Sequence, residues 1–193
     1  MDVKEAIAKR RSIRSFQEQQ IPEHVLEDIF QLASWAPTHR MKEPWKLKVF
    51  QGKGRNIYVK ALMRSYERLG FFHQNQTEKA EKMKQGIETY LFSIPHHVLV
   101  YMEKEEDPLK MDEDFASVSA FIQNVQLIAW SKGIGVLWTS SPCYYENGFY
   151  EEIGLHMKGH KIVGLLQMGF PKSIPEPKPR TAIQEKVEWV EEG

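Results

Sequence analysis

Apolar residues in this chain recur every three or four positions over several stretches, a spacing typical of helices that bury one face. The clearest stretch runs from Asp112 to Lys132, and Gly133 is placed to end it in a left-handed turn. Its stripe comprises Phe115, Val118, Ser119, Ile122, Val125, Gln126 and Ala129. Further helices are expected from Val3 to near Arg11, from Pro22 to Ala36, from Gly54 to Gly70, over the polar residues 74–93 and, more briefly, around Tyr150.

Four other stretches are short and apolar or alternate in polarity, which predicts strands. They are Trp45–Phe50, His97–Tyr101, Ile134–Thr139 and Lys161–Met168. Helices that alternate with about four strands predict a layered α/β or α+β domain, with one sheet covered by helices. No repeat or linker divides residues 1–193, so we expect one domain, with 171–193 as a proline-rich extended arm that lies over a surface.

Composition narrows the class of protein. The 193 residues carry 26 basic and 26 acidic side chains, so no overall field attracts nucleic acid or an anionic membrane. The charged start lacks the apolar core of a secretory signal, and no apolar run is long enough to span a bilayer. The single cysteine, Cys143, cannot form an internal disulfide. We therefore expect a cytoplasmic protein without a nucleic-acid or membrane partner.

Several short motifs carry little chemistry. Gly133-Ile134-Gly135 follows a helix and precedes a strand, the reverse of a dinucleotide fingerprint, and is better explained as a helix stop. The segment 52–54 (GKG) lacks a third glycine, and the histidine pairs 96–97 and 156/160 lack the context of a zinc site, so no metal is expected. Cys143 is expected to be a packing thiol.

A cationic stretch near the N-terminus is different. Arg10, Ser12 and Arg14 alternate where a helix gives way to extended chain, which directs them to one side. Guanidinium groups and a hydroxyl suit a phosphate monoester through charge-assisted hydrogen bonds. Taken alone, the same stretch also fits an ordinary solvated face.

Four ordered segments decide between these alternatives. KRRSIRSF at 9–16, APTHRMKEPWKLKVF at 36–50, the stretch from Gln123 to Ser140 and KIVGLLQMGFPK at 161–172 resemble the nitroreductase family of FMN-dependent NAD(P)H oxidoreductases, in its compact subgroup. The resemblance implies an α+β fold with a central mixed, largely antiparallel sheet flanked by helices. It also implies a homodimer with FMN bound at the subunit interface.

The resemblance assigns roles by position. The flavin phosphate, ribityl chain and pyrimidine edge would contact Arg10, Arg11, Ser12 and Arg14, with Lys178 or Arg180 of the arm joining the phosphate. The flavin ring would contact Trp35, His39, Trp138, Thr139 and Ser140, with the loop 38–43 supplied by the partner subunit. NAD(P)H would contact the helix end formed by Ile128, Ala129, Trp130, Ser131, Lys132 and Gly133.

One departure affects the expected chemistry. Many relatives carry Asn and Gln in the loop where Met41 and Glu43 stand here. Amide contacts to the ring would be lost, and the Glu43 carboxylate would disfavour a negatively charged reduced flavin. The redox potential and the substrate range therefore do not follow from the resemblance.

The implied function is transfer of a hydride from NAD(P)H through flavin N5 to an organic acceptor such as a nitroaromatic or a quinone, in a ping-pong cycle without a catalytic side chain. One alternative is an FMN-binding protein for sensing, storage or flavin remodelling that does not turn over NAD(P)H. Another is a flavin-free protein whose basic stretch contacts RNA or an acidic partner.

Overall fold

The fold of the computed structural model, which describes residues 1–72 and 78–191, is built on one antiparallel sheet. Strands β1 (Lys46–Gln51), β2 (His96–Glu103), β3 (Gly135–Thr139) and β4 (His160–Gly169) lie in the order β1-β2-β4-β3. All three pairings are antiparallel, and the β2–β4 register shifts at Val100/Tyr101. The predicted layered α+β fold is confirmed, with every pairing between the four strands antiparallel.

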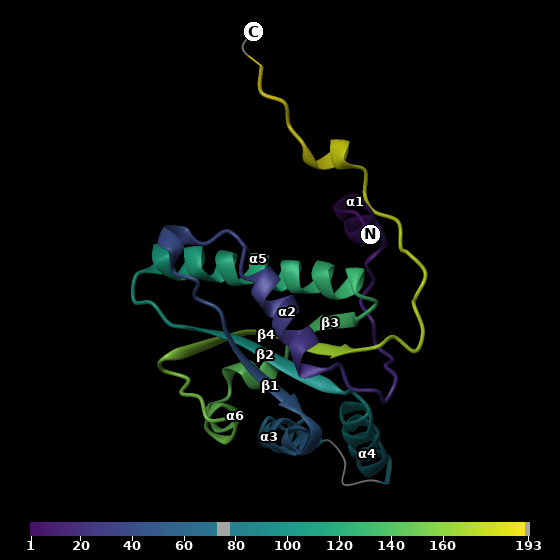
Figure 1. Cartoon of the computed structure of the whole chain (residues 1–193). Coiled ribbons are helices and arrows are strands. Elements are labelled where there is room, and N and C mark those ends of the chain that lie inside the picture. Colours follow the sequence, from purple (N-terminus) through teal and green to yellow (C-terminus); the bar gives the residue numbers. More distant parts are fainter. Residues whose placement is uncertain (73–77, 192–193) are drawn as a thin grey trace.

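Helices cover both faces of the sheet (Figure 1). Helices α2 (Glu23–Ala33) and α5 (Pro108–Ser131) pack on one face, whereas α3 (Arg55–Arg68), α4 (Glu78–Phe92) and α6 (Asn147–Glu152) lie on the other. Each face has its own core: Val98, Val100, Leu166 and Met168 pack with the first pair, and Leu99 and Leu165 pack with the second group. This two-sided burial explains the nearly continuous apolar character of β2 and β4.

The predicted helices form within a few residues of their expected bounds. Helix α5 begins four residues before Asp112, because Asp107 caps it by accepting a hydrogen bond from the Leu109 amide. It ends as predicted, since Gly133 has a φ of +74°. The predicted helix over 74–93 is present as α4, while residues 74–77 lie outside the described residues.

Two surfaces remain uncovered by the described residues of the single chain. Helix α1 (Val3–Lys9) ends two residues before Arg11 and buries only Ala6, while Val3 and Ile7 are exposed. The C-terminal arm, described over residues 171–191, is extended as predicted but leaves the body and projects past α1 instead of lying on it (Figure 1). It carries exposed apolar side chains, including Trp189 and Val190.

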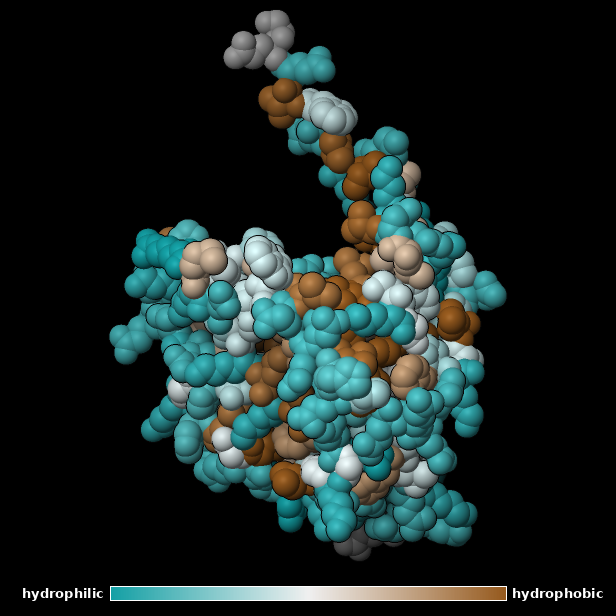
Figure 2. Space-filling view, in the orientation of Figure 1, coloured by the Kyte–Doolittle hydropathy of each residue, from teal (hydrophilic) through white to brown (hydrophobic). Residues whose placement is uncertain are grey.

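The surface beneath this arm is also apolar. Figure 2 shows hydrophobic residues gathered over α2 and α5, next to the projecting arm. On α5, Leu127 and Ile128 are only partly buried although the opposite side of the helix is fully packed. A helix that is apolar on more than one side is usually covered on more than one side.

Candidate functional site

The cationic stretch lies along the outer edge of β3. Ser12 forms a parallel bridge with Val136, and the Ile13 amide donates to the Val136 carbonyl at 3.2 Å. Ile13 is buried against Gly135, where a Cβ would lie only 2.6 Å from the Ile13 side chain. Because Ile13 faces inward, its neighbours Ser12 and Arg14 are exposed, as the alternation predicted.

Arg10 is held at the start of this edge by a buried amide. Its Nη1 donates to Oε1 of Gln126 at 3.0 Å, and the Gln126 side chain comes from the C-terminal part of α5. Its Nε is buried and has no hydrogen-bond partner among the described residues. Burial lowers the pKa of Arg10 below its usual value, and the charges of Arg180 and Arg11 lower it further. The guanidinium therefore lies in a positive environment with donor capacity left over.

The other basic residues of the stretch have different surroundings. Arg11 is half-buried and donates to the carbonyl oxygens of Ala8 and Arg10, so it helps to end α1. Burial raises the pKa of Tyr90 and the nearby charge of Arg14 opposes that shift, which places Arg14 next to the end of α4. Tyr90 in turn donates to buried Gln167 on β4 at 2.9 Å.

The C-terminal arm brings a further cation to Arg10. The arm leaves the sheet beside the cationic stretch, because Phe16 pairs with Pro171 and the Lys172 amide donates to the Ser15 carbonyl. Further along, the charge of Arg180 reaches Arg10, whereas Lys178 is simply exposed. Of the two basic residues that the resemblance offered for a phosphate site, only Arg180 acts on Arg10 through its charge, although both are exposed.

The end of β3 carries the aromatic and hydroxyl groups predicted there. Trp138 lies over Gly164 of β4, at which a Cβ would lie 2.1 Å from the indole nitrogen, and it remains 38% exposed. Thr139 is partly buried and its hydroxyl donates to the Leu165 carbonyl at 3.4 Å, while Ser140 is exposed. An accessible indole next to an exposed hydroxyl group can bind a flat, partly polar ring.

The loop 38–43 is packed against the other end of α5. His39 lies 3.5 Å from Glu113, and Lys42 forms ion pairs with Glu105 and buried Asp114. Residues 114 and 126 lie about 18 Å apart along the helix axis. Within one chain, the loop and Arg10 therefore lie far apart. Trp35, which precedes the loop, is 83% exposed.

The loop adopts an unusual backbone. Arg40, Met41 and Glu43 have φ values of +51°, +54° and +49°, although none is glycine. The left-handed region costs non-glycine residues roughly 1–2 kcal/mol each, so neighbouring contacts must hold it. One of these is the Glu43 amide, which donates to the Thr38 hydroxyl at 2.9 Å.

The helix end predicted to bind NAD(P)H is only partly accessible. Ala129 is fully buried in the core, so its side chain cannot contact a nucleotide. Trp130 is half-buried and its indole nitrogen has no partner among the described residues. Lys132 forms an ion pair with Asp28 at 2.7 Å, and the Ser131 hydroxyl donates to the Ile128 carbonyl. Of the six residues predicted to contact NAD(P)H, those that are exposed are Ser131, Lys132 and Gly133.

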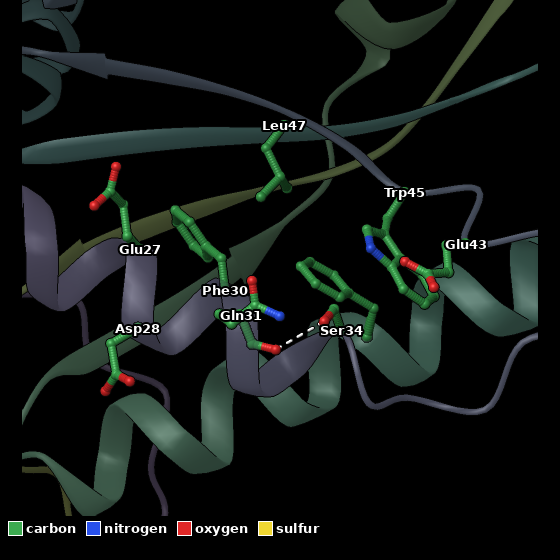
Figure 3. Close-up of a pocket in the computed structure, with 9 residues that line it drawn as sticks. Glu27, Asp28, Phe30, Gln31, Ser34, Glu43, Trp45 and Leu47 are labelled. Carbon is green, nitrogen blue, oxygen red and sulfur yellow. Dashed lines mark hydrogen bonds between the residues drawn. The ribbon is translucent and has the colours of Figure 1, made fainter.

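Two hollows open on either side of the loop. The larger, of about 720 Å³, has an aromatic wall in which Trp45 stacks on Phe121 at 5.0 Å between ring centroids. Figure 3 shows Glu27, Phe30 and Gln31 of α2 facing Glu43 and Trp45 across it. The smaller, of about 360 Å³, is lined by Pro37, Thr38, His39, Glu113, Ala116 and Ser117.

Cys143 and the possibility of a metal site or a membrane span were also considered from the sequence. Cys143 is buried in the core on the α3 side, and burial raises the pKa of its thiol. Over residues 1–72 and 78–191, no cluster of three His, Cys, Asp or Glu side chains could hold a metal ion. None of the described helices is long and apolar enough to cross a membrane.

Sequence reasoning missed the residues that support these groups. Gln126 was assigned only to a packing stripe, yet it holds Arg10. Asp114 and Lys42 were not singled out, although residue 114 stands four positions before Val118 on the apolar stripe, where a carboxylate is conspicuous. A polar residue on a helix face that is otherwise apolar was the signal for both Gln126 and Asp114.

Comparisons with known proteins identify the family of this chain. The model of the Nitroreductase family matches residues 7–170. The chain is 32% identical over 185 residues to "Putative NAD(P)H nitroreductase YfhC" of Bacillus subtilis (strain 168), covering 95% of this chain and 92% of that protein.

Solved structures share the fold. A nitroreductase-like family protein from Bacillus cereus superposes with a TM-score of 0.88 at 35% identity, covering 99% of this chain and 97% of the other. The FMN and NADPH-dependent nitroreductase NfnB from Sphigopyxis sp. strain HMH has the same fold, with a TM-score of 0.79 at 19% identity over 98% of this chain and 99% of its own. This chain belongs to the nitroreductase family.

Proposed function

We propose that this chain is an FMN-dependent oxidoreductase that passes a hydride from NAD(P)H to a small organic acceptor, such as a nitroaromatic or a quinone, and that it works as a homodimer. Membership of the nitroreductase family supports this proposal, as does the name of the similar Bacillus subtilis protein. The observation that carries it is the buried Nε of Arg10, which has no hydrogen-bond partner within residues 1–72 and 78–191 and lies among the charges of Arg11 and Arg180.

The residues present fit FMN. A guanidinium with a free buried donor and two cations nearby lacks only an anion, and a phosphate monoester supplies one. Arg10, Ser12 and Arg180 would hold the phosphate, with Gln126 fixing the guanidinium. The far end of β3 offers Trp138, Thr139 and Ser140 to the ring, and Arg14 lies between these two ends.

FMN, when bound, supplies the two-electron chemistry of its N5 position. The side chains have supporting tasks. Arg14 would stabilise negative charge at the pyrimidine edge, since a preorganised cation acts most strongly where water is excluded. Trp138 would pack against the ring and exclude that water. We assign no acid or base among the side chains.

Two features support a homodimer. The loop 38–43 and the cationic stretch lie at opposite ends of α5 within one chain, so a second copy is needed to bring Trp35 and His39 to the flavin. The projecting arm and the apolar surface over α2 and α5 are each without a partner in the single chain (Figure 2). Association would cover both surfaces.

Nucleotide and acceptor would use the same open side of the flavin in turn. At the end of α5, Ser131, Lys132 and Gly133 are the groups that remain for NAD(P)H, since Ala129 is buried. Lys132 would have to leave Asp28 in order to bind a nucleotide phosphate.

Anaerobic reduction of the purified protein tests this function. NADH or NADPH should bleach the flavin absorption, and 1,4-benzoquinone should restore it. A yellow protein that neither nucleotide bleaches would be a flavin-binding protein without reductase activity. A colourless protein that binds no added FMN would remove the flavin from the account and leave an RNA or acidic partner for the basic stretch.

A further inference from the structure

The side chain at the centre of the loop 38–43 ties its strained backbone to the rest of the chain. Arg40, Met41 and Glu43 occupy the left-handed region, and Lys42 lies among them with an ordinary helical φ of −71°. The Lys42 ammonium reaches back to α5, where it pairs with Asp114, and to Glu105 just before that helix. The hydrogen bonds to Asp114 and Glu105 raise the pKa of Lys42 above its usual value, so it is charged at neutral pH.

The partner carboxylate is unusual for an ion pair at the surface. Asp114 is buried, with a side chain only 5% exposed, whereas Glu105 is 29% exposed. A buried carboxylate that loses its cation is strongly unfavourable, so Asp114 resists the departure of Lys42. Surface ion pairs without a buried member usually contribute little. The Lys42–Asp114 pair therefore fixes the loop more firmly than its exposed position suggests.

Lys42 lies between the loop residues that line the two hollows. On one side of it, Glu43 and Trp45 line the larger hollow, and on the other side Thr38 and His39 line the smaller one. Both hollows are also lined by residues of α5, namely Phe121 in the larger and Glu113 in the smaller. A shift of Lys42 relative to α5 would move the walls of both.

We propose that the Lys42–Asp114 pair is a positioning device that presets the loop 38–43 for the organic acceptor. The acceptor role rests on the proposed function, whereas the clamp itself rests on the contacts above. Lys42 and Asp114 are positioning residues, since they act through the backbone of Arg40, Met41 and Glu43. The pair takes no part in holding the FMN phosphate.

The first arm of the test measures backbone protection in the protein as purified. The double variant Lys42→Met/Asp114→Asn removes both charges and leaves no buried charge unpaired. We expect amide hydrogen exchange within residues 38–43 to accelerate about tenfold, with no acceleration in β2 or β4. Lys42→Arg keeps the charge and should stay within about twofold of the wild type. Lys46→Met is the matched control, because it breaks the nearby Lys46–Glu103 pair, in which both partners are exposed.

The second arm measures turnover with 1,4-benzoquinone at saturating NAD(P)H. The double variant should raise the KM for the quinone at least about fivefold, because a loose loop presents the acceptor wall only part of the time. Bound FMN should stay at one per chain in the same samples. Lys42→Arg should restore the KM.

Each result has one meaning. Unchanged exchange at 38–43, or acceleration spread evenly over the sheet, would overturn the clamp. Faster exchange confined to the loop with an unchanged KM would overturn its role in positioning the acceptor. A wild-type protein without flavin or turnover would refute the proposed function, while the exchange measurements would still decide whether Lys42 and Asp114 hold the loop.

Discussion

Arg10 shows how one side chain can be prepared for an anion. Its guanidinium is partly removed from water, receives one contact from Gln126 and faces the charges of Arg11 and Arg180. A cation in such surroundings is destabilised relative to water, and the lowered pKa of Arg10 expresses this. A bound phosphate would offset this destabilisation of the Arg10 cation, which would favour binding of the phosphate.

Arg180 is the arm residue expected to contact that phosphate. Arg180→Ala should weaken FMN binding about tenfold or more, since a charge-assisted hydrogen bond contributes roughly 1.5–3 kcal/mol. Added FMN should partly restore the melting temperature of the variant. Lys178→Ala provides the control and should leave affinity unchanged, as the charges that lower the pKa of Arg10 are those of Arg180 and Arg11 and not that of Lys178. A dissociation constant within about twofold of the wild type for Arg180→Ala would leave the phosphate to the N-terminal stretch alone.

Two buried histidines predict how stability depends on pH. His96 accepts a hydrogen bond from the Ile21 amide through Nε2 and lies 3.1 Å from Oε1 of Gln51, while His97 Nε2 donates to the Leu91 carbonyl. Burial lowers the pKa of each to about 4, and the charge of Arg55 contributes in both cases. Between pH 4 and about pH 6.5, the unfolded chain therefore binds more protons than the folded chain. The stabilisation from the two neutral histidines is fully present above about pH 6.5 and is lost as the pH falls toward 4.

Urea denaturation at pH 7 and pH 4.5 measures this loss. We expect on the order of 2 kcal/mol for each histidine. His97→Gln can still donate to Leu91 but cannot titrate, so its unfolding free energy should fall less between the two pH values. His24→Gln, at an exposed position, should behave like the wild type. Identical pH dependence in His97→Gln and the wild type would show that His97 is not the group responsible.

At the scale of elements, periodicity was enough to predict the strands and the five longer helices to within a few residues. It succeeded because burial on both faces of the sheet leaves a strong signal in β2, β4 and α5. It predicted α1 as a helix but not what covers it, because Val3 and Ile7 are exposed in the single chain and a stripe does not say which molecule covers it. The left-handed loop could not be predicted either, since no residue in THRMKE is glycine and Lys42 of the loop contacts Asp114, which is distant in sequence.

The C-terminal arm can be removed without removing residues of the folded body. Deleting everything after Pro171 removes Arg180 and exposed apolar residues such as Trp189, but no part of the sheet or its two cores. We expect weaker FMN binding together with a lower melting temperature, as the stabilisation by ligand decreases when the dissociation constant rises. Calorimetry with and without FMN provides the measurement. An arm that is only a solvated tail would be lost without effect on either quantity.

At the scale of the whole molecule, the apolar surface over α2 and α5 predicts association. The protein should sediment as a dimer of twice 22.6 kDa, burying more than about 2,000 Å² in total. Substituting Leu127, which is only partly buried on α5, by glutamate should shift the protein toward the monomer and release FMN at the same time. A fully flavinated monomer in sedimentation would contradict a site shared between two chains.

If the edge of β3 holds the phosphate of FMN, the protein must distinguish FMN from riboflavin. Riboflavin lacks the phosphate, so flavin-free wild-type protein should bind FMN at least about a hundredfold more tightly. Arg10→Ala should remove most of that preference by weakening FMN alone. Lys9→Ala should keep the preference, because Lys9 is exposed and paired with Glu5. Equal affinity of the wild type for FMN and riboflavin, or an unchanged preference in Arg10→Ala, would contradict the account.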